Sequence, residues 1–289
     1  MDNLELMKQL PDQCINLIYC DILYNTGKSF DDYDDNLGTP QEAMVWYEPR
    51  LLEMKRILKD TGSIYLQCDY RLVHYLKVKM DEIFGFDNFR NDIIWKRDSV
   101  GKGAKKSSKQ WSRELDNILF YSKSNNIIFH QQYKTNSELG HTQLKEFRYA
   151  DPDGRKFKIV TLGDYSQDSI EAIRKQNLIY KTSTGKEYKK YYLDEFKLAV
   201  GSLWDDIPNL SHGKNPENIG YDTQKPKKLL ERIIKASSNE GDLVADFFCG
   251  SGTTCVVAKE LGRDYLGCDI NPKAIDITYE RLYNNFEVS

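Results

Sequence analysis

The chain has 289 residues, of which 40% are hydrophobic and 29% charged, with a formal net charge of −3 at pH 7. This composition is typical of a soluble globular protein. No apolar run approaches the roughly 20 residues of a membrane span, and the first residues lack a signal-peptide pattern. We therefore expect a cytoplasmic protein that does not bind membranes. The six cysteines form no Cys-x-x-Cys pair, so we expect free thiols and no metal site.

Short apolar segments alternate with helical patterns in the first part of the chain. Residues 16–21 form an apolar run that ends in Asp21, and Thr39, Pro40 and Glu42 are typical of a capped helix start. We expect the apolar side of that helix to carry Trp46, Leu51, Leu52, Met54 and Leu58. Further strands are predicted over residues 62–67, 89–95 and 117–121, and a helix over 73–84. This alternation predicts a doubly wound α/β sheet, mixed at one edge.

Residues from about 101 to 220 interrupt this alternation, because they are polar and rich in Lys, Tyr, Asn and Ser. We expect an inserted recognition region there, with a strand over 157–160 and a helix over 169–175. The stretch from Lys96 to Arg113, which leads into this region, carries seven basic residues against one acid, Asp98. The basic residues are Lys96, Arg97, Lys102, Lys105, Lys106, Lys109 and Arg113. Such a cluster can bind nucleic-acid phosphates, although charge alone favours a solvated surface loop.

A glycine turn near the C-terminal end predicts a nucleotide site. Residues 241–248 form a predicted strand that ends near Gly250 and Gly252, and a helix over 253–261 follows. The next predicted strand, 266–270, contains Asp269. Glycines allow a ligand to approach the backbone, a helix start offers free N–H groups, and the acid can hold ribose hydroxyls. Cys255 stands where the third glycine of a dinucleotide fingerprint belongs, which argues against an NAD-dependent dehydrogenase.

A second motif, Asp21-Ile22-Leu23-Tyr24, follows the first predicted strand. Ligands bind at the carboxyl ends of the strands in a doubly wound sheet. The Asp21 carboxylate can accept a hydrogen bond from an exocyclic amine, and the Tyr24 ring can stack on a planar base. The alternative interpretation is a capping Asp and a core Tyr.

Together these motifs resemble one family. Their order is Asp21–Tyr24, the basic region, residues 223–226 (Thr-Gln-Lys-Pro) and residues 246–254 (Asp-Phe-Phe-Cys-Gly-Ser-Gly-Thr-Thr). This order is similar to that of the circularly permuted β-class amino-group DNA methyltransferases. The resemblance covers nearly the whole chain. It implies a Rossmann-like methyltransferase domain in two parts, 1–96 and 218–289, around a DNA-contacting and target-recognition region, 97–217.

The resemblance also implies roles for individual residues. S-adenosylmethionine is the implied cofactor, and double-stranded DNA is the implied partner; a homodimer and a cognate restriction endonuclease remain open. Asp21, Ile22, Leu23 and Tyr24 are the implied catalytic residues. The implied cofactor-binding residues are Asp2, Asp21, Thr223, Lys225, Asp246, Phe248, Gly250, Gly252, Thr253, Thr254 and Asp269. Trp95 and the seven basic residues from Lys96 to Arg113 are expected to border the DNA.

The chain departs from the family pattern at two places. Ile22 and Leu23 replace the two prolines of the family's Asp-Pro-Pro-Tyr motif. Because prolines stiffen a loop, one hypothesis is that the site has lost rigidity and activity. Ile22 still offers the backbone carbonyl that the family uses. In addition, only Met1 precedes Asp2, whereas the family pattern has a strand leading into this acid; we expect either a start further upstream or another element that covers this edge. We expect weak contacts to the cofactor adenine, or dimerisation, at this edge.

The reaction that the resemblance implies is direct attack of an exocyclic amine on the methyl group, with the target base flipped out of the duplex. Adenine N6 is the expected target because the tetrapeptide begins with Asp, and cytosine N4 is the alternative. A DNA-binding homologue without activity is a further alternative. Cytosine C5 chemistry is not expected, because Cys20 lies on the opposite side of the strand from Asp21 and lacks a preceding proline.

Overall fold

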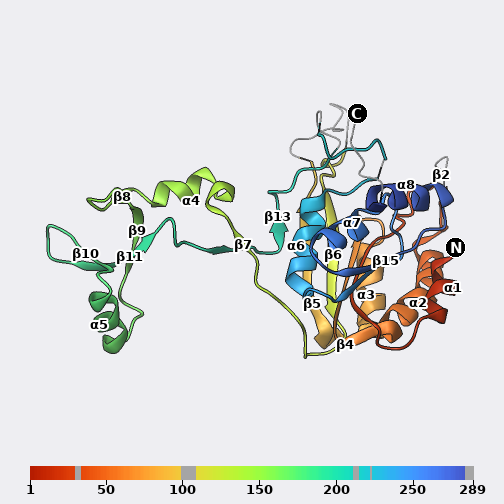
Figure 1. Cartoon of the computed structure of the whole chain (residues 1–289), viewed down its shortest axis with the longest axis horizontal. Helices are drawn as coiled ribbons and strands as arrows, with labels where there is room; N and C mark the ends of the chain where they lie inside the picture. Colours follow the sequence, from red (N-terminus) through yellow and green to blue (C-terminus); the bar gives the residue numbers. More distant parts are fainter. Residues whose placement is uncertain (30–33, 99–108, 211–214, 222, 284–289) are drawn as a thin grey trace. The chain divides into compact units, whose positions relative to one another are not determined.

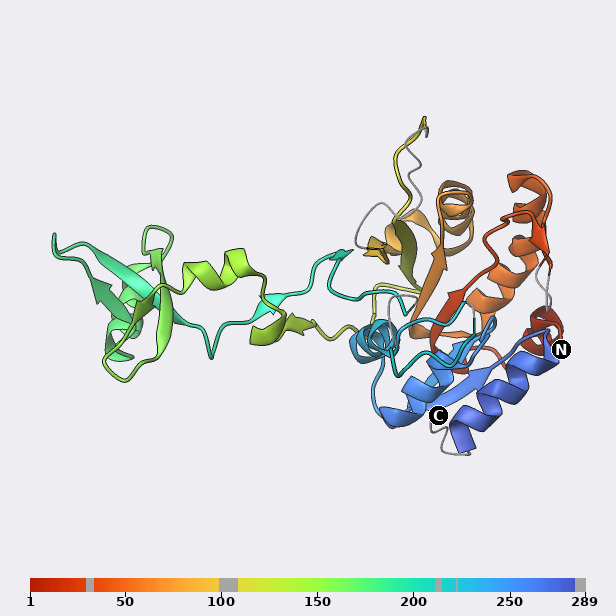
Figure 2. The ribbon, with the colours of Figure 1, turned by 90° about the horizontal axis from the view of Figure 1, so that it is seen from above.

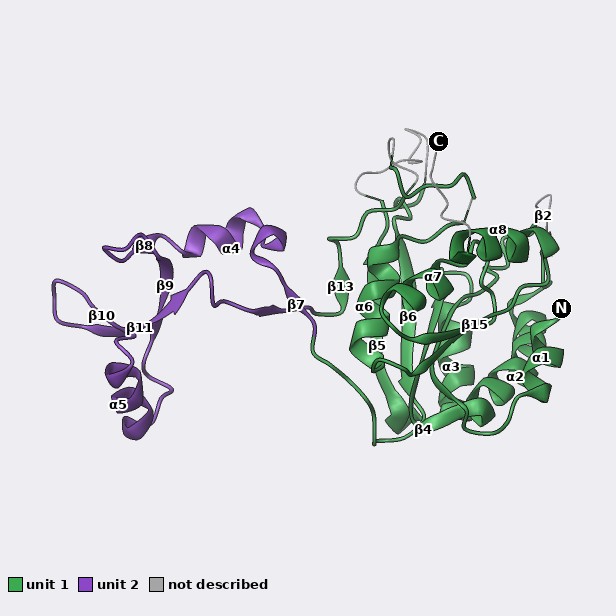
Figure 3. Ribbon diagram, viewed as in Figure 1, with its two compact units in different colours: residues 1–131, 201–289 green, residues 132–200 purple. Residues whose placement is uncertain are grey.

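The structure is a computed structural model that describes residues 1–29, 34–98, 109–210, 215–221 and 223–283. It divides into two compact units (Figure 3): unit 1 comprises residues 1–131 and 201–289, and unit 2 comprises 132–200. Unit 2 is therefore shorter than the predicted insertion, 97–217. The reason is that two strands within that range belong to the main sheet of unit 1, namely β6 (Leu115–Ser122) and β13 (Leu203–Trp204).

Unit 1 is built on a seven-stranded sheet with the order β13-β5-β6-β4-β1-β14-β15. Its other strands are β1 (Ile15–Asp21), β4 (Leu58–Cys68), β5 (Phe89–Lys96), β14 (Leu243–Asp246) and β15 (Asp264–Gly267). The strands β4, β1, β14 and β15 run parallel, whereas β6 is antiparallel to both of its neighbours. The predicted doubly wound sheet with a mixed edge is confirmed. The carboxyl ends of β1 and β14 lie side by side, where the strand order reverses.

Helices cover both faces of this sheet (Figures 1 and 2). One face carries α1 (Asn3–Gln9), α2 (Pro40–Ile57) and α3 (Val73–Phe84), and the other carries α6 (Lys227–Ser237), α7 (Thr253–Glu260) and α8 (Pro272–Tyr283). Short elements η1 (Phe86–Asn88), β2 (Lys28–Ser29) and β3 (Asp34–Asp35) complete unit 1. Among the described residues, no helix combines the length and apolarity needed to span a membrane.

The start of α2 follows its sequence signature. Thr39 caps the helix in a reciprocal capping box with Glu42, which satisfies backbone N–H groups that the first turn leaves free. Leu51 and Met54 are buried, as predicted, but Leu52 is 51% exposed. The prediction for Leu52 was wrong because it and Leu51 are adjacent, and neighbours on a helix point about 100° apart.

The strand after the glycine turn begins and ends earlier than predicted. It spans Asp264–Gly267 rather than 266–270, so Asp269 lies in the loop that follows. Gly267 also explains why Cys255 is tolerated. A Cβ at Gly267 would lie 2.7 Å from the Cys255 sulfur, so the strand supplies the space that a glycine in the helix would otherwise supply.

Unit 2 contains a four-stranded sheet with the order β10-β11-β9-β8. Its elements are β7 (Tyr133–Lys134), η2 (Asn136–Glu138), α4 (His141–Glu146), β8 (Tyr149–Ala150), β9 (Lys156–Thr161), α5 (Gln167–Lys175), β10 (Ile179–Lys181), β11 (Glu187–Tyr192) and β12 (Leu198–Ala199). Phe157 is 1% exposed and contacts the rings of Tyr149, Tyr180 and Tyr192. Strands β7 and β12 pair at the two ends of the unit.

Candidate functional site

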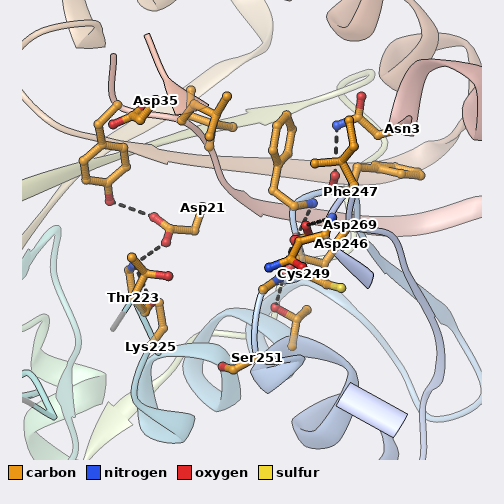
Figure 4. A pocket seen from close by; sticks show the side chains of 18 of the residues that line it. Asn3, Asp21, Asp35, Thr223, Lys225, Asp246, Phe247, Cys249, Ser251 and Asp269 are labelled. Carbon is orange, nitrogen blue, oxygen red and sulfur yellow. Dashed lines mark hydrogen bonds and ion pairs between the residues drawn. The ribbon is translucent and has the colours of Figure 1, made fainter. Parts of the chain in front are cut away.

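A cavity of about 600 Å³ lies at the carboxyl ends of β1 and β14, a size typical of small-molecule sites. Figure 4 shows Asp21 at one side of it, with Asp246 and Asp269 at the other. The cavity brings together all four predicted catalytic residues and, except for Gly252, all of the predicted cofactor residues. These lining residues are Asp2, Asp21, Ile22, Leu23, Tyr24, Thr223, Lys225, Asp246, Phe248, Gly250, Thr253, Thr254 and Asp269.

The glycine turn between β14 and α7 is held by Asp246. This carboxylate is 2% exposed and accepts hydrogen bonds from the Phe248 amide at 3.0 Å and the Thr254 hydroxyl at 2.5 Å. Gly252, the N-cap of α7, has a φ of +74°, a left-handed conformation that favours glycine. A Cβ at Gly252 would lie 2.4 Å from the Thr278 hydroxyl oxygen. Gly252 therefore shapes the turn without lining the cavity.

Asp269 binds back onto this turn from the loop after β15. Its carboxylate accepts hydrogen bonds from the backbone amides of Gly250 and Asn271, each at 2.9 Å. A carboxylate has about four lone-pair directions, so these two bonds orient the group and leave acceptor capacity towards the cavity. The sequence predicted this acid but not its backbone partners.

Asp2 lies at the start of α1, close to the Asp269 loop: the Met1 amino group donates to the Asp269 carbonyl at 3.2 Å. Asp2 caps this helix by accepting from the Leu4 amide at 2.8 Å, and it forms an ion pair with Arg50 at 2.8 Å. The Arg50 guanidinium stacks on the ring of Trp46 at 3.5 Å, and Trp46 contacts Phe248 at 6.2 Å between ring centroids. The sequence analysis missed Arg50 as a partner, since a charged residue inside a helical pattern gave no signal, and it placed Trp46 only in the core.

Asp21 is held from two sides by its own chain. Its Oδ1 accepts from the Tyr24 hydroxyl at 2.7 Å, and its Oδ2 is bound by the Lys225 ammonium group (Figure 4). Lys225 also donates to the Thr223 carbonyl at 3.2 Å. Burial raises the pKa of the Tyr24 hydroxyl well above its usual value, and the nearby Asp21 raises it further. Tyr24 is therefore a neutral hydrogen-bond donor at physiological pH.

The two positions without proline are fixed by hydrogen bonds. The Ile22 amide donates to the Gln67 carbonyl at 3.2 Å, and the Tyr47 hydroxyl donates to the Leu23 carbonyl at 2.8 Å. A proline has no N–H and could not form the first of these bonds. Among the described residues, none donates a hydrogen bond to the Ile22 carbonyl. The loop thus has anchors of its own, which the sequence alone did not reveal.

The predicted DNA-contacting residues are only partly described. Lys102, Lys105 and Lys106 lie outside the described residues, whereas Lys109 and Arg113 are exposed. The Arg113 guanidinium lies 3.8 Å from the centre of the Tyr70 ring. Lys109 and Arg113 thus present positive charge at the surface, and their contact with DNA stays a prediction.

One further expectation for this segment, that Trp95 borders the DNA, was wrong. Trp95 is 1% exposed, and its indole N–H donates to the Ile207 carbonyl at 2.8 Å, so it belongs to the core and cannot border DNA. Arg97 pairs with the buried Asp116 at 3.1 Å while 28% of its side chain stays exposed, so its contact with DNA remains a prediction. The exposed aromatic residue is instead Trp111, at 94% exposure, which the sequence analysis did not single out.

The cysteines and acids provide no metal centre in the described part of the chain. All six cysteines are free, and no group of three or more Cys, His, Asp or Glu side chains there could hold a metal ion. Burial raises the pKa of the Cys20 thiol well above its usual value, so Cys20 is a poor nucleophile.

The buried Asp246 should make the free energy of unfolding depend on pH. Burial raises its pKa to about 7, whereas an unfolded Asp has a pKa of about 3.9. The folded chain therefore binds this proton more tightly, and the free energy of unfolding falls as pH rises from about 4 to about 7, by up to about 4 kcal/mol. Urea unfolding without cofactor at pH 5 and 8 measures this effect. Asp246→Asn should remove it, and an equal pH dependence in both proteins would refute it.

Comparison with known proteins places the chain in a family. The family model described as DNA methylase matches residues 15–280. Type II methyltransferase M.EcaI of Enterobacter cloacae is 30% identical over 284 residues, covering 88% of this chain and 61% of that protein. DNA adenine methyltransferase YhdJ of Escherichia coli (strain K12) is 27% identical over 282 residues, covering 97% and 80%. The StyLTI Mod subunit of Salmonella typhimurium is longer, and the chain covers only 49% of it.

Solved structures share the fold. The PvuII DNA methyltransferase (cytosine-N4-specific) has a TM-score of 0.56 and 17% identity, and the match covers 99% of this chain and 86% of that one. A DNA modification methylase of Thermus thermophilus, solved in complex with S-adenosyl-L-methionine, has a TM-score of 0.54 and 17% identity, covering 98% and 91%. The chain therefore belongs to the DNA methylase family of N6-adenine and N4-cytosine enzymes, whose cofactor is S-adenosylmethionine.

Proposed function

We propose that this chain transfers a methyl group from S-adenosylmethionine to the N6 amine of adenine in double-stranded DNA. The observation that carries this proposal is the shared cavity. It places the Asp21–Tyr24 pair at the end of β1 beside the glycine turn at the end of β14. The amine that receives the methyl group and the cofactor that donates it could thus bind next to each other at the two strand ends, in the crevice where α/β sheets bind their ligands.

The cavity residues fit the proposed cofactor. The open glycine turn at Gly250 and the N-terminus of α7 suit its amino-acid end, and Asp269 retains acceptor capacity for ribose hydroxyls. Trp46 and Phe248 offer apolar ring surfaces for its adenine. When bound, the cofactor supplies an electrophilic methyl group on a sulfonium ion.

The chain's own residues would orient and polarise the target amine. Asp21 would accept a hydrogen bond from one N–H, and the Ile22 carbonyl would accept one from the other. Both interactions increase electron density on the nitrogen, and the carboxylate can take the proton that the amine loses. Lys225 is paired with the other oxygen of that carboxylate and holds the side chain in place. The Tyr24 ring would stack on a base that has left the duplex.

Adenine is favoured over cytosine on two grounds. The tetrapeptide begins with Asp, which the family's adenine enzymes carry more often than its cytosine enzymes do. In addition, the relative named as a DNA adenine methyltransferase aligns with 97% of this chain. Methylation of cytosine N4 is the alternative. The anchored Ile22 and Leu23 backbone weighs against a chain without activity.

A product assay tests the proposal. Purified chain is incubated with labelled S-adenosylmethionine and unmethylated genomic DNA, and the DNA is digested to nucleosides. Labelled N6-methyladenine is the expected product. Labelled N4-methylcytosine would replace the adenine assignment, and the absence of any labelled nucleoside, with cofactor binding intact, would refute the proposed activity.

The exposed Trp111 yields a separate prediction. Replacing it with alanine should weaken DNA binding by roughly tenfold, since an aromatic contact with a base contributes about 1–3 kcal/mol, and should leave cofactor binding unchanged. Val45→Ala is a matched control, because Val45 is also 72% exposed but lies on α2, away from the basic segment. Fluorescence anisotropy with labelled duplex DNA measures the effect, and equal affinities for the two variants would contradict it.

A further inference from the structure

The residues that hold the catalytic loop lie on two neighbouring strands. Gln67, on β4, is 0% exposed, and Asp116, on β6, is 2% exposed. Polar side chains this deeply buried are costly unless their hydrogen bonds are satisfied. Both residues direct those bonds at the Asp21–Tyr24 motif, and neither lines the cavity. They are therefore candidates for residues that act through the motif.

Gln67 binds both ends of the motif. Its backbone carbonyl accepts from the Ile22 amide at 3.2 Å, and its side-chain Nε2 donates to the Tyr24 hydroxyl oxygen at 3.2 Å. Its Oε1 accepts from the Tyr19 hydroxyl at 2.7 Å, which assigns the orientation of the amide. The main chain of Gln67 thus fixes the start of the loop, and its side chain fixes the end.

Asp116 completes the arrangement. Its Oδ2 accepts from Gln67 Nε2 at 3.1 Å and lies 3.1 Å from the Tyr24 hydroxyl. The Tyr24 hydroxyl also donates to Asp21 at 2.7 Å, so one phenolic oxygen lies between two carboxylates. The hydroxyl has a single hydrogen, so it can donate to only one of the two carboxylates at a time, and both carboxylates influence where the hydroxyl lies.

The other carboxylate oxygen of Asp116 faces the basic segment. Arg97 Nη1 lies 3.1 Å from Oδ1, as an ion pair without hydrogen-bond geometry, and this oxygen has no hydrogen-bond donor among the described residues. Burial raises the pKa of Asp116, while Arg97 opposes that shift. Hydrogen bonds from Gln67 and Tyr24 therefore fix the orientation of the Asp116 carboxylate, whereas Arg97 only balances its charge.

We propose that Asp116, together with Gln67, is a positioning residue that fixes the Tyr24 hydroxyl, and through it Asp21, for methyl transfer. These buried contacts supply the rigidity that the Asp-Ile-Leu-Tyr sequence does not supply through its own backbone. The inference rests on the proposed function, because it assigns Asp21 and Tyr24 to the reaction. It concerns hydrogen bonding by Asp116, and the ion pair with Arg97 has only a charge-balancing role.

Two substitutions of Asp116 separate these roles. Asp116→Ala removes the acceptor and should lower kcat by roughly 10- to 100-fold, because small misplacements of reacting groups are costly, with little change in the KM for the cofactor. Asp116→Asn keeps an acceptor for Gln67 and Tyr24 and should stay within about threefold of wild type. Equal losses in both variants would mean that only the charge matters, and would overturn the proposal.

A double-mutant cycle with Tyr24→Phe tests the route of the effect. Phenylalanine keeps the ring but removes the hydroxyl, so Asp116→Ala should have little further effect on kcat in that background. If Asp116→Ala lowers kcat by the same factor with and without Tyr24→Phe, the two residues act independently and the proposal is overturned. Asp69→Ala is the matched control: Asp69 is 4% exposed and paired with Arg71, and its loss should lower the Tm but not kcat.

The cycle remains informative in two difficult cases. If Asp116→Ala does not fold, Gln67→Met removes the donor to Tyr24 at similar side-chain volume and takes its place in the cycle. If the wild-type chain transfers no methyl group, the proposed function fails, and the cycle is read from Tm. Non-additive Tm shifts of Tyr24→Phe and Asp116→Ala would then support the positioning contact, and additive shifts would overturn it.

Discussion

Asp21→Asn should reduce kcat for methyl transfer by roughly 10²- to 10⁴-fold, the range that positioned proton-accepting groups contribute. The substitution keeps the shape of the side chain but removes the charge that draws the amine proton. Cofactor affinity should change much less, because the glycine turn, Asp246 and Asp269 stay in place. Single-turnover rates with labelled cofactor and isothermal titration with the cofactor measure the two effects separately.

The control must account for the lost ion pair with Lys225, whose partners have side-chain exposures of 14% and 19%. Asp206 pairs with Arg232 at 2.5 Å, with exposures of 13% and 8%, and does not line the cavity. The Asp206→Asn variant should therefore lose about as much stability as the Asp21→Asn variant, but its rate of methyl transfer should not change. Similar turnover in the Asp21 and Asp206 variants would remove Asp21 from the reaction.

Gly252→Ala should disable the cofactor site through sterics. The new Cβ would meet Thr278 side-chain atoms at 2.4 to 2.7 Å, in a backbone conformation with φ +74°. The helix start must shift to relieve the overlap, at a cost of about 3 kcal/mol or more, and cofactor affinity should fall at least about tenfold. Urea unfolding and isothermal titration measure these two changes.

Gly241 provides the matched control for this variant. It has a φ of +78°, yet a Cβ there meets no atom within 4 Å, so Gly241→Ala carries the conformational cost alone, about 1–2 kcal/mol. The difference between the two variants isolates the overlap with Thr278. If both lose the same stability and keep the same cofactor affinity, the close packing at Gly252 has no functional importance.

The parts of the site that were predictable share one property: they are encoded by residues close together in the sequence. Asp21 follows an apolar run, and Gly250 and Gly252 stand between a strand and a helix, so pattern and spacing located them. The turn chemistry at Thr39 was equally local. The resemblance to the family then connected these separate segments into one cavity.

The missed parts depend on contacts between distant residues. Asp116 contacts Tyr24 although the two residues lie 92 positions apart in the sequence. Nothing in the sequence around Gln67 distinguishes it from other residues at the end of a strand. Trp95 was misassigned because the carbonyl that accepts its indole N–H, that of Ile207, lies 112 positions away. Sheet topology determines such neighbours, and no local pattern records which strand lies beside which.

The pairing of β7 with β12 has a consequence for how this chain could diversify. The Val200 amide donates to the Gln132 carbonyl at 2.9 Å, so the polypeptide leaves and re-enters unit 1 at nearly the same point. Exchanging everything between these residues for a segment of another length would cost unit 1 little chain entropy. Evolution could thus replace unit 2 as one segment while the sheet of unit 1 stays unchanged.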